Sequence, residues 1–234
     1  MPDIAVFDMP CVFSDIESVR EAIDGDFFME KIQNVYHEGG YELLGFADQG
    51  FRVMSTSKPV YAIDDFKGQK IRTMENSYHM QFWKELLANP TPMTFSEVYI
   101  GLEQGTIDAQ ENPYEVIVSN KLYEQQDYVV ETNHLPHLIS LIVSDEFMQG
   151  LPEEQQDIIR ESVKVAKEYA REQSDERIAS RIDIIEESGT AILPMDEELR
   201  TEVVKRCEPV YTNIRANIDG ELADAYAGKH IVTP

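Results

Sequence analysis

Cysteine is scarce in this sequence, in which Cys11 and Cys207 are the only two among 234 residues. They form no CxxC motif and no histidine cluster lies near them in the sequence, so neither a zinc site nor a redox motif is supported. We expect both side chains to pack as small hydrophobic groups. A disulfide between them would require Cα atoms within about 7 Å of each other, which the sequence leaves open.

Long apolar runs are also absent. No stretch of about 18 apolar residues occurs, so we expect no membrane-spanning helix. The sequence does not open with a charged and then apolar leader, so we expect no export signal within the chain as given.

Positively charged residues are also few. The chain has 20 Lys and Arg residues against 44 Asp and Glu residues, which gives a net charge of −24. A charge of this sign and size repels nucleic acid phosphates and anionic lipid surfaces, so neither is an expected partner. We expect the acidic excess to form a solvated surface.

The residues that are present predict a globular protein, because 42% of them are hydrophobic and 234 residues are enough to bury a sizeable core. The stretch Lys70 to Pro113 is the most informative. Its apolar periodicity and its proline and glycine stops predict, in order, a strand at 69–73, a helix at 75–87, a turn at 89–92, a helix at 96–102 and a strand at 106–110.

Two predicted strand ends in this stretch carry side chains suited to a small anion. Arg72 lies near the end of the first strand and Asn112 just after the second, where open α/β sheets present groups to ligands. A guanidinium matches a carboxylate with two parallel hydrogen bonds, an amide can serve a further oxygen, and Phe95 adds an aromatic surface. The alternative is that Arg72 is a surface arginine paired with acidic neighbours.

The segment PTPMTFSEVYIGLEQGTIDAQENP at residues 90–113, with KIR at 70–72 and TNH at 132–134, resembles a known family. It is similar to the substrate-binding subunit of tripartite ATP-independent periplasmic (TRAP) transporters, of the dicarboxylate-binding DctP type. The resemblance runs over nearly the whole chain and is densest between Gly50 and His134. One departure inside the motif is Ala109, where the family usually has glycine.

The resemblance implies four ligand-binding residues. The arginine that clamps the substrate carboxylate in the family falls on Arg72, and the second arginine, in a GFR turn, falls on Arg52. The asparagine of the QENP motif falls on Asn112 and the aromatic residue after PTPM on Phe95.

The resemblance also implies the fold class, which is α/β: a periplasmic-binding-protein-like two-lobe fold of type II, with the first lobe incomplete and a long helix packed across both lobes. Residues 1–50 would then be part of the first lobe, and residues 51–137 a second lobe with the carboxylate site. Residues 138–234 would return to the first lobe and add the long and C-terminal helices.

Apolar periodicity supports this outline along the rest of the chain. It predicts helices at 16–36, 114–124, 196–214 and 217–226 and strands at 41–50, 128–130, 138–143 and 191–193. A helix from Pro152 to about Gly189 is the longest predicted element. A coiled-coil arm is the alternative for this segment, but Ser162, Lys164 and Ser174 interrupt a heptad seam.

The start of the chain motivates a hypothesis about assembly. Members of the family have two further βα units and a signal peptide ahead of the point that matches residues 5–13. Without those units, strands of the first lobe would be left unpaired, and unpaired strand edges recruit partners. We therefore expect a homodimer or segment exchange, with a compact monomer as the alternative.

The expected function is that of a receptor without enzymatic activity or a cofactor. It would bind a small organic acid, such as a C4-dicarboxylate or a uronate, and deliver it to the TRAP transporter membrane subunits from a periplasmic or extracytoplasmic location. Glu75 and Asn76 could select ligand hydroxyls, although capping of the following helix is an equal alternative.

Two other functional classes remain open in the sequence. One is an enzyme on the same scaffold that uses His79, His134 or His137 as a base near Glu75, although no nucleophile or metal set accompanies them. The other is a truncated remnant that lacks ligand binding, because family members also draw ligand contacts from the N-terminal part.

Overall fold

The computed structural model of the protein describes residues 1–228. The strands are β1 (Tyr41–Thr56), β2 (Lys70–Thr73), β3 (Asn89–Pro92), β4 (Ala109–Pro113), β5 (Tyr128–Ser144) and β6 (Ala191–Pro194). The α-helices are α1 (Ile16–Asp24), α2 (Asp26–Glu38), α3 (Ser77–Glu85), α4 (Val98–Glu103), α5 (Tyr114–Ser119), α6 (Asp145–Gln149), α7 (Glu153–Glu187), α8 (Glu197–Arg206), α9 (Glu208–Arg215) and α10 (Gly220–Ala227). The 3-10 helices are η1 (Pro2–Asp8), η2 (Ile63–Phe66), η3 (Phe95–Glu97) and η4 (Leu122–Gln125).

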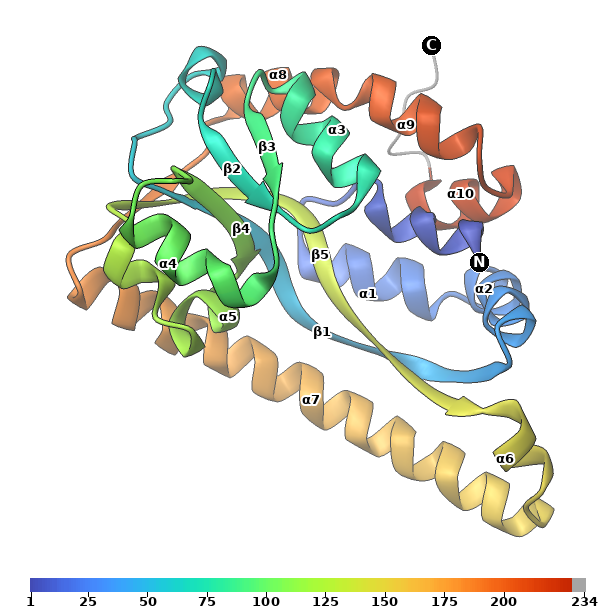
Figure 1. The fold of residues 1–234 in the computed structure, drawn as a ribbon. Helices are drawn as coiled ribbons and strands as arrows, with labels where there is room; N and C mark the ends of the chain where they lie inside the picture. Colours follow the sequence, from blue (N-terminus) through green and yellow to red (C-terminus); the bar gives the residue numbers. More distant parts are fainter. Residues whose placement is uncertain (229–234) are drawn as a thin grey trace.

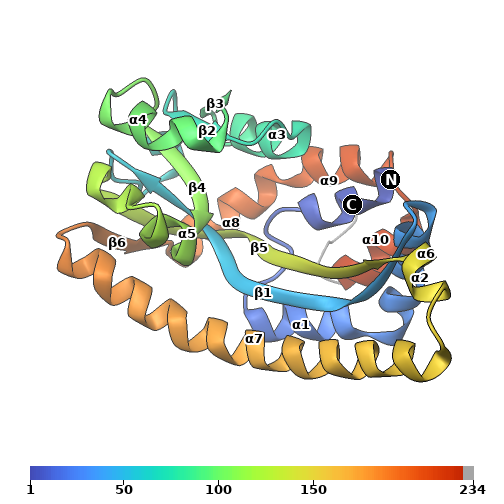
Figure 2. The ribbon, with the colours of Figure 1, turned by 60° about the horizontal axis from the view of Figure 1, so that its bottom comes forward.

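The strands form one six-stranded sheet in the order β3-β2-β4-β1-β5-β6. β1 pairs antiparallel with β4 and with β5, whereas β2 pairs parallel with β3 and β4, and β5 pairs parallel with β6. β1 and β5 run side by side through the length of the molecule (Figures 1 and 2). The sheet is therefore mixed, and the expected α/β class is confirmed.

The two longest strands, β1 and β5, continue through positions where the sequence predicted that a strand would end. The strand predicted at 41–50 continues to Thr56 as the single strand β1, and the two predicted strands at 128–130 and 138–143 form the single strand β5. The pairing of β1 with β5 shifts its register at three places in β1, namely Leu43/Gly45, Asp48/Phe51 and Arg52/Met54. Such bulges bend a strand without ending it, so the turn-like glycines did not mark strand ends.

Gly50 lies at one of these bulges, two residues before Arg52. Its φ is +71°, and a Cβ added there would lie 2.7 Å from Cδ1 of Ile178 on α7. Only glycine adopts this backbone conformation at little cost and lets α7 approach β1 this closely. The bulge thus needs glycine, and it sets the direction in which β1 enters the site described below.

We expect Gly50→Ala to lower the free energy of unfolding by about 1.5–3.5 kcal/mol. About 1–2 kcal/mol comes from the left-handed backbone, and about 0.5–1.5 kcal/mol from moving Ile178 off its rotamer. Gly68→Ala is the matched control, because Gly68 has a φ of +73° but no atom within 4 Å of an added Cβ. Urea unfolding of both variants measures the difference, and an equal loss in the two would contradict the close approach of α7 at Gly50.

The long helix α7 lies along β1 and also contacts α5 and β6, as Figure 1 shows below the sheet. Arg171 anchors its centre, because Nε and Nη2 donate to the Phe46 carbonyl at 3.1 and 2.7 Å and the same side chain forms an ion pair with Asp24. The expectation of a packed long helix is therefore confirmed over the coiled-coil arm.

Three further helical and turn predictions need correction. The helix predicted at 16–36 is divided at Gly25, which is extended with φ −65° and ψ 133°, into α1 and α2. The helix predicted at 196–214, with a kink expected at Pro209, is instead divided at Cys207 into α8 and α9, and Pro209 lies in the first turn of α9. Residues 89–92 form β3 rather than only a turn, and its prolines are tolerated because this strand pairs with β2 alone at the sheet edge.

The buried apolar residues form two clusters. The larger contains side chains of η1, α1, α2, α3, α9 and α10 and surrounds Phe28, Phe46 and Tyr226. The smaller joins α4 and α5 to the end of α7 around Val98, Ile117 and Ile185. The division of the chain into lobes at residues 50 and 137 stays a prediction.

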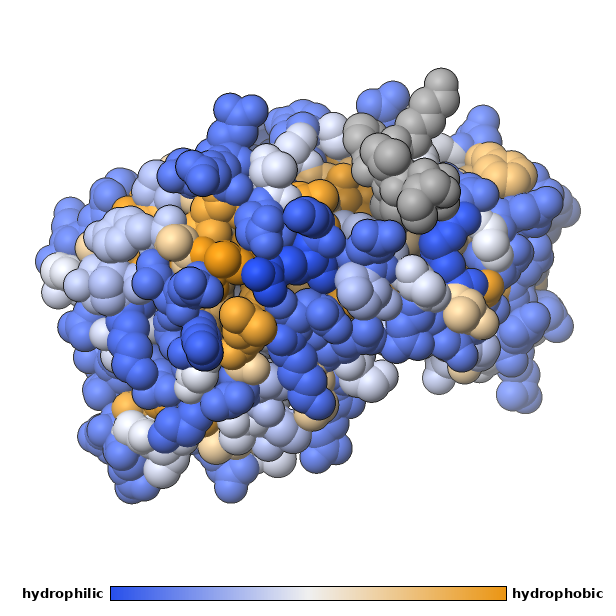
Figure 3. All heavy atoms as spheres, turned by 90° about the horizontal axis from the view of Figure 1, so that it is seen from above, coloured by the Kyte–Doolittle hydropathy of each residue, from blue (hydrophilic) through white to orange (hydrophobic). Residues whose placement is uncertain are grey.

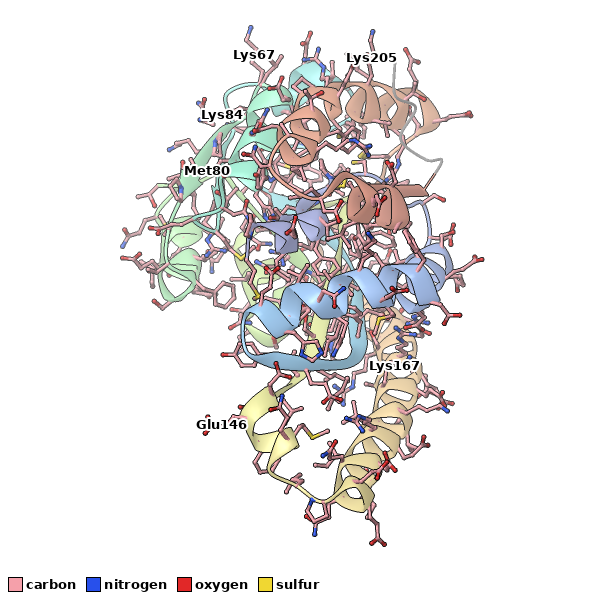
Figure 4. The ribbon with its side chains drawn as sticks, turned by 90° about the vertical axis from the view of Figure 1, so that its right-hand side faces the viewer. Lys67, Met80, Lys84, Glu146, Lys167 and Lys205 are labelled. Atoms are coloured by element: carbon pink, nitrogen blue, oxygen red, sulfur yellow. The ribbon has the colours of Figure 1, made fainter. Side chains whose placement is uncertain are left out.

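The surface is strongly hydrophilic, as the composition predicts. Figure 3 shows a face covered mainly by hydrophilic residues, with small groups of hydrophobic residues between them. Lys67 and Lys205 point outward at one end of the molecule in Figure 4. Within residues 1–228, none of the helices has the length and apolar character needed to cross a membrane.

Candidate functional site

Adjacent strands bring the predicted ligand residues to one part of the sheet. In the antiparallel pair of β1 and β4, Arg52 lies opposite Pro113 and Val53 opposite Asn112. In the parallel pair of β2 and β4, Arg72 lies opposite Gln110. Residues distant in the sequence thus come from three neighbouring strands, with β4 in the middle.

Arg72 is buried and has no carboxylate in contact. Its side chain is 3% exposed, and Nε and Nη2 donate to the Met93 carbonyl at 2.9 and 2.8 Å. The guanidinium carbon lies 5.6 Å from the centre of the Phe95 ring, which is a cation–π contact. Among the described residues Arg72 makes no salt bridge, and Nη1 has no hydrogen-bond partner. Burial lowers the pKa of Arg72; the charge of Glu111 opposes this effect and the charge of Arg52 adds to it.

Arg52, by contrast, is paired with a carboxylate. Nε donates to Oε2 of Glu111 at 2.6 Å, and Nη2 donates to Oε1 of Glu111 at 2.9 Å. Nη2 also donates to the Glu111 carbonyl at 2.9 Å and to Oδ1 of Asn112 at 3.1 Å. Burial alone would raise the pKa of the Glu111 carboxyl, but the Arg52 guanidinium, together with His134, holds it well below its usual range. This bidentate pair fixes the plane of the Arg52 fork.

Two histidines complete the surroundings of the pair. His134 contacts Oε2 of Glu111 through Nε2 at 3.1 Å and Oγ1 of Thr132 through Nδ1 at 2.9 Å. His137 accepts a hydrogen bond from Nη1 of Arg52 at its Nδ1, at 3.0 Å. Burial lowers the pKa of His134, and burial with the charge of Arg52 lowers the pKa of His137 to about 4. Both imidazoles are therefore neutral near pH 7.

A chain of buried amides extends from the arginine pair. Asn112 accepts from Arg52 and donates through Nδ2 to Oε1 of Gln110 at 2.6 Å. Gln110 donates to Oγ of Ser55 at 2.8 Å, and Ser55 donates to Oε1 of Gln126 at 2.9 Å. Each polar group in this chain has a partner, so the chain holds Asn112 in one orientation.

The other three predicted site residues lie in different surroundings. Phe95 is 40% exposed, and the Arg72 guanidinium lies over its ring. Asn76 caps α3, because its Oδ1 accepts from the backbone N–H groups of Tyr78 and His79, and its Nδ2 donates to Asp8 at 3.0 Å. Glu75 is exposed. The capping alternative for Asn76 is thus what the structure shows.

The charges of the buried groups leave one positive charge uncompensated. Two guanidiniums, Arg52 and Arg72, lie with one carboxylate, Glu111, and neutral histidines. Removing a charge from water is costly unless an opposite charge joins it. The arrangement is therefore suited to a ligand that brings one negative charge and oxygen acceptors.

Two cavities in the described part of the chain lie apart from this arrangement. No group of three or more metal-ligating side chains occurs within residues 1–228. A cavity of about 820 Å³ lies between residues 61–63 and α8, and another of about 250 Å³ lies between β1 and α7. Neither is lined by any of the six predicted ligand residues.

The sequence interpretation missed the partner of Arg52. Glu111 is 0% exposed in the middle of the QENP motif, and it was not singled out. The sequence does carry a signal for this pairing, because Glu111 lies at a predicted strand end. A carboxylate that is buried at such a position requires a cation beside it. His134, His137 and His79 had been considered as catalytic bases, and they contact Glu111, Arg52 and Asp8 instead, the last at 2.9 Å.

Comparison with known proteins gives one family. The model of the DctP family, described as bacterial extracellular solute-binding protein, family 7, matches residues 1–217. The 2,3-diketo-L-gulonate-binding periplasmic protein YiaO of Escherichia coli is 32% identical over 193 residues, which cover 82% of this chain and 58% of YiaO. The C4-dicarboxylate-binding periplasmic protein DctP of Vibrio cholerae is 29% identical over 227 residues, which cover 94% of this chain and 66% of DctP.

Solved structures agree with this family. The periplasmic ectoine-binding protein of the TeaABC TRAP transporter of Halomonas elongata superposes with a TM-score of 0.91 and 27% identity over 98% of this chain and 76% of that chain. The described chain therefore has the two-lobe, type II-like fold of TRAP periplasmic binding proteins. It spans less than two thirds of the length of several curated relatives, for example 60% of a solute-binding protein of Verminephrobacter eiseniae. The match over residues 1–217 shows that this chain belongs to the bacterial extracellular solute-binding proteins of family 7, the DctP-type receptors of TRAP transporters.

Proposed function

We propose that this protein is an extracytoplasmic solute receptor that binds a small organic acid and delivers it to the membrane subunits of a TRAP transporter. The observation that carries the proposal is Arg72, which is buried, charged and without a carboxylate partner among the described residues. Family membership supports the same conclusion, because the named relatives bind acids such as C4-dicarboxylate and 2,3-diketo-L-gulonate.

Each site residue has a distinct part in this proposal. Arg72 binds the ligand carboxylate through Nη1 and through Nε and Nη2, which donate to the Met93 carbonyl in the protein without ligand. Phe95 forms an apolar wall beside it. Arg52 and Asn112 contact a neighbouring oxygen of the ligand. They do so through N–H groups that are not bonded to Glu111, His137 or Gln110. Glu75, which is exposed, stays a proposed contact for ligand hydroxyls, whereas both ends of the Asn76 amide are already bonded.

Binding would also draw the two lobes together. In this proposal residues 51–137 form the lobe that carries the carboxylate site, and residues 1–50 with 138–234 form the other. A ligand that contacts both lobes binds the closed form better and so shifts the population toward it. β1 and β5 are the connections between the lobes, and their register shifts near Gly50 and Arg52 are where such a motion would bend them.

Isothermal titration calorimetry with a panel of acids tests the proposal. The panel contains succinate, galacturonate, L-gulonate, D-erythronate and ectoine, ligands named for solved relatives, and the control is a neutral sugar of similar size. We expect saturable heat with at least one acid, none with the neutral sugar, and no turnover of the bound acid. Heat from the neutral sugar alone, or turnover of an acid, would contradict the receptor, and silence throughout would favour a remnant without binding.

A second proposal concerns self-association through β5. Residues 138–144, LISLIVS, pair with β1, whereas β6 pairs with β5 only at residues 128–131, so within the described chain one edge of this segment has no partner strand. The segment is uncharged and β-forming, and Ile139 and Ile142 are 38% and 44% exposed. Figure 4 shows the neighbouring α6, with Glu146 pointing outward, projecting beyond the main body. Pairing of two copies would bury this edge and satisfy its backbone groups.

Light scattering at high micromolar concentration tests this second proposal. We expect a mass of twice 26.8 kDa for the wild type and a return to the monomer for Ile142→Lys, because lysine on an edge strand opposes pairing. Ile100→Lys is the control, since Ile100 is 48% exposed on α4, away from β5. A wild type that stays monomeric would contradict the proposal.

A further inference from the structure

The two cysteines, far apart in the sequence, meet in the interior. Cys11 follows η1 and Cys207 lies at the junction of α8 and α9, and their exposed fractions are 8% and 0%. Both are present as thiols; Sγ of Cys207 donates to the Val203 carbonyl at 3.3 Å, and the approach of the two side chains shifts the pKa of both thiols. Contact between the sulfur groups satisfies the first requirement for a disulfide, which two cysteines with distant or diverging side chains cannot meet.

The surrounding backbone holds the two segments together at this point. The Tyr211 hydroxyl, one helical turn after Cys207, donates to the Pro10 carbonyl at 2.5 Å. The Cys11 N–H donates to the His134 carbonyl at 2.6 Å. Cys11 also has a φ of +57°, which side-chain-bearing residues rarely adopt. The two hydrogen bonds therefore hold the N-terminal segment against α9 and β5 beside the cysteines.

We propose that Cys11 and Cys207 form a disulfide that joins the N-terminal segment to the junction of α8 and α9. The oxidant is a disulfide donor of the extracytoplasmic space, such as a disulfide oxidoreductase, and oxidised glutathione serves in vitro. One cysteine thiolate attacks the donor disulfide and forms a mixed disulfide, releasing one donor thiol. The second cysteine thiolate then displaces the other donor sulfur. The protein loses two electrons and two protons, and the donor gains them as two thiols.

The environment distinguishes the two sulfurs. The approach of Cys207 lowers the pKa of Cys11, and Arg200 acts in the same direction. The approach of Cys11 and burial raise the pKa of Cys207. Since the thiolate is the attacking species, Cys11 is the first nucleophile and Cys207 the resolving thiol. Once formed, the bond is buried and protected from reductants in solution.

The cross-link would stabilise the protein by restricting the unfolded chain. It closes a loop from residue 11 to residue 207, and the entropy removed from an unfolded chain increases with loop length. Disulfides of this kind raise the melting temperature of a domain of this size by about 5–15 °C. We therefore expect the oxidised protein to melt about 5 °C or more above the reduced protein.

Intact-mass spectrometry and thermal unfolding of the full chain test the proposal. After equilibration with oxidised glutathione, we expect a mass lower by two hydrogen atoms, no thiol that reacts with iodoacetamide in denaturant, and a Cys11–Cys207 cross-linked peptide. Cys207→Ser should abolish the dependence of the melting temperature on redox conditions. Two reactive thiols in the oxidised wild type, or equal melting temperatures of its oxidised and reduced forms, would overturn the proposal.

The mass measurement requires only the wild type, so the test stands even if the variant folds poorly. The proposed disulfide rests on the proposed function in one respect only, which is the extracytoplasmic compartment where it would form. Its outcome is independent of ligand binding, because calorimetry with organic acids can succeed or fail on either redox form.

Discussion

Replacing Arg72 with methionine is expected to weaken binding of the organic acid by at least about 30-fold, because removing one partner of a buried charge pair costs about 2–5 kcal/mol. The same variant should keep or increase the stability of the ligand-free protein. Methionine retains much of the side-chain volume and removes a guanidinium that is 3% exposed and has no carboxylate partner. Calorimetry measures the first effect and thermal unfolding the second.

Two companion variants separate charge from geometry. Arg72→Lys keeps the charge but loses the planar fork, so we expect intermediate affinity. Arg160→Met removes a partly exposed arginine that pairs with Glu42 on the surface, and it should leave binding unchanged. Wild-type affinity in Arg72→Met would show that the ligand carboxylate binds elsewhere, and a marked loss of stability would show that the hydrogen bonds to the Met93 carbonyl outweigh the cost of the buried charge.

Replacing Glu111 with glutamine should have the opposite effect on the free protein. The change leaves the buried guanidiniums of Arg52 and Arg72 without a carboxylate, and breaking a buried pair in this way costs about 3–5 kcal/mol. For a domain of this size the melting temperature should fall by about 6–20 °C. Glu115→Gln is the matched control, because Glu115 pairs with Arg181 at 2.7 Å in a partly exposed position, where about 1 kcal/mol or less is expected.

The same carboxylate predicts how stability depends on pH. The pKa of Glu111 is lower in the folded protein than its ordinary value of 4.5, so its contribution is complete above pH 4.5 and is lost as the pH falls below that value. The pKa of His137 is lowered from 6.5 to about 4, so protonation of the unfolded chain favours unfolding between these values. Stability should therefore decrease from about pH 6.5 downward.

Urea unfolding as a function of pH measures this dependence. In Glu111→Gln the loss below pH 4.5 should be smaller than in the wild type, because the titrating carboxyl is absent. Equal curves for the two proteins, or a melting temperature of Glu111→Gln near that of the wild type, would contradict the assignment of Glu111 as the charge partner of Arg52.

The sequence was sufficient to place the candidate ligand residues on the sheet. The KIR and QENP segments predicted two strand ends, and Arg72 and Asn112 lie on the adjacent strands β2 and β4. The contact between Arg72 and Phe95 also follows the expected arrangement. These features depend on short segments with clear apolar patterns and stop residues, which local sequence determines well.

Features set by long-range packing were not predictable in the same way. Gly50 resembles the end of a strand in the sequence, but its positive φ forms a bulge within β1 because α7 packs against it. Pro90 and Pro92 resemble a turn, but an edge strand tolerates them. The pairing of Glu111 with Arg52 joins residues 59 positions apart, and only the three-dimensional arrangement shows which of the arginines it neutralises.

The central claim is that the Arg72 guanidinium is held without a protein carboxylate so that it can receive the carboxylate of a ligand. A crystal structure with the tightest-binding acid of the panel tests it most directly. We predict carboxylate oxygens about 2.7–2.9 Å from the guanidinium nitrogens of Arg72, with Phe95 against the ligand. A ligand bound elsewhere, for example in the cavity between Tyr61 and α8, with Arg72 still bonded to the Met93 carbonyl alone, would contradict the account.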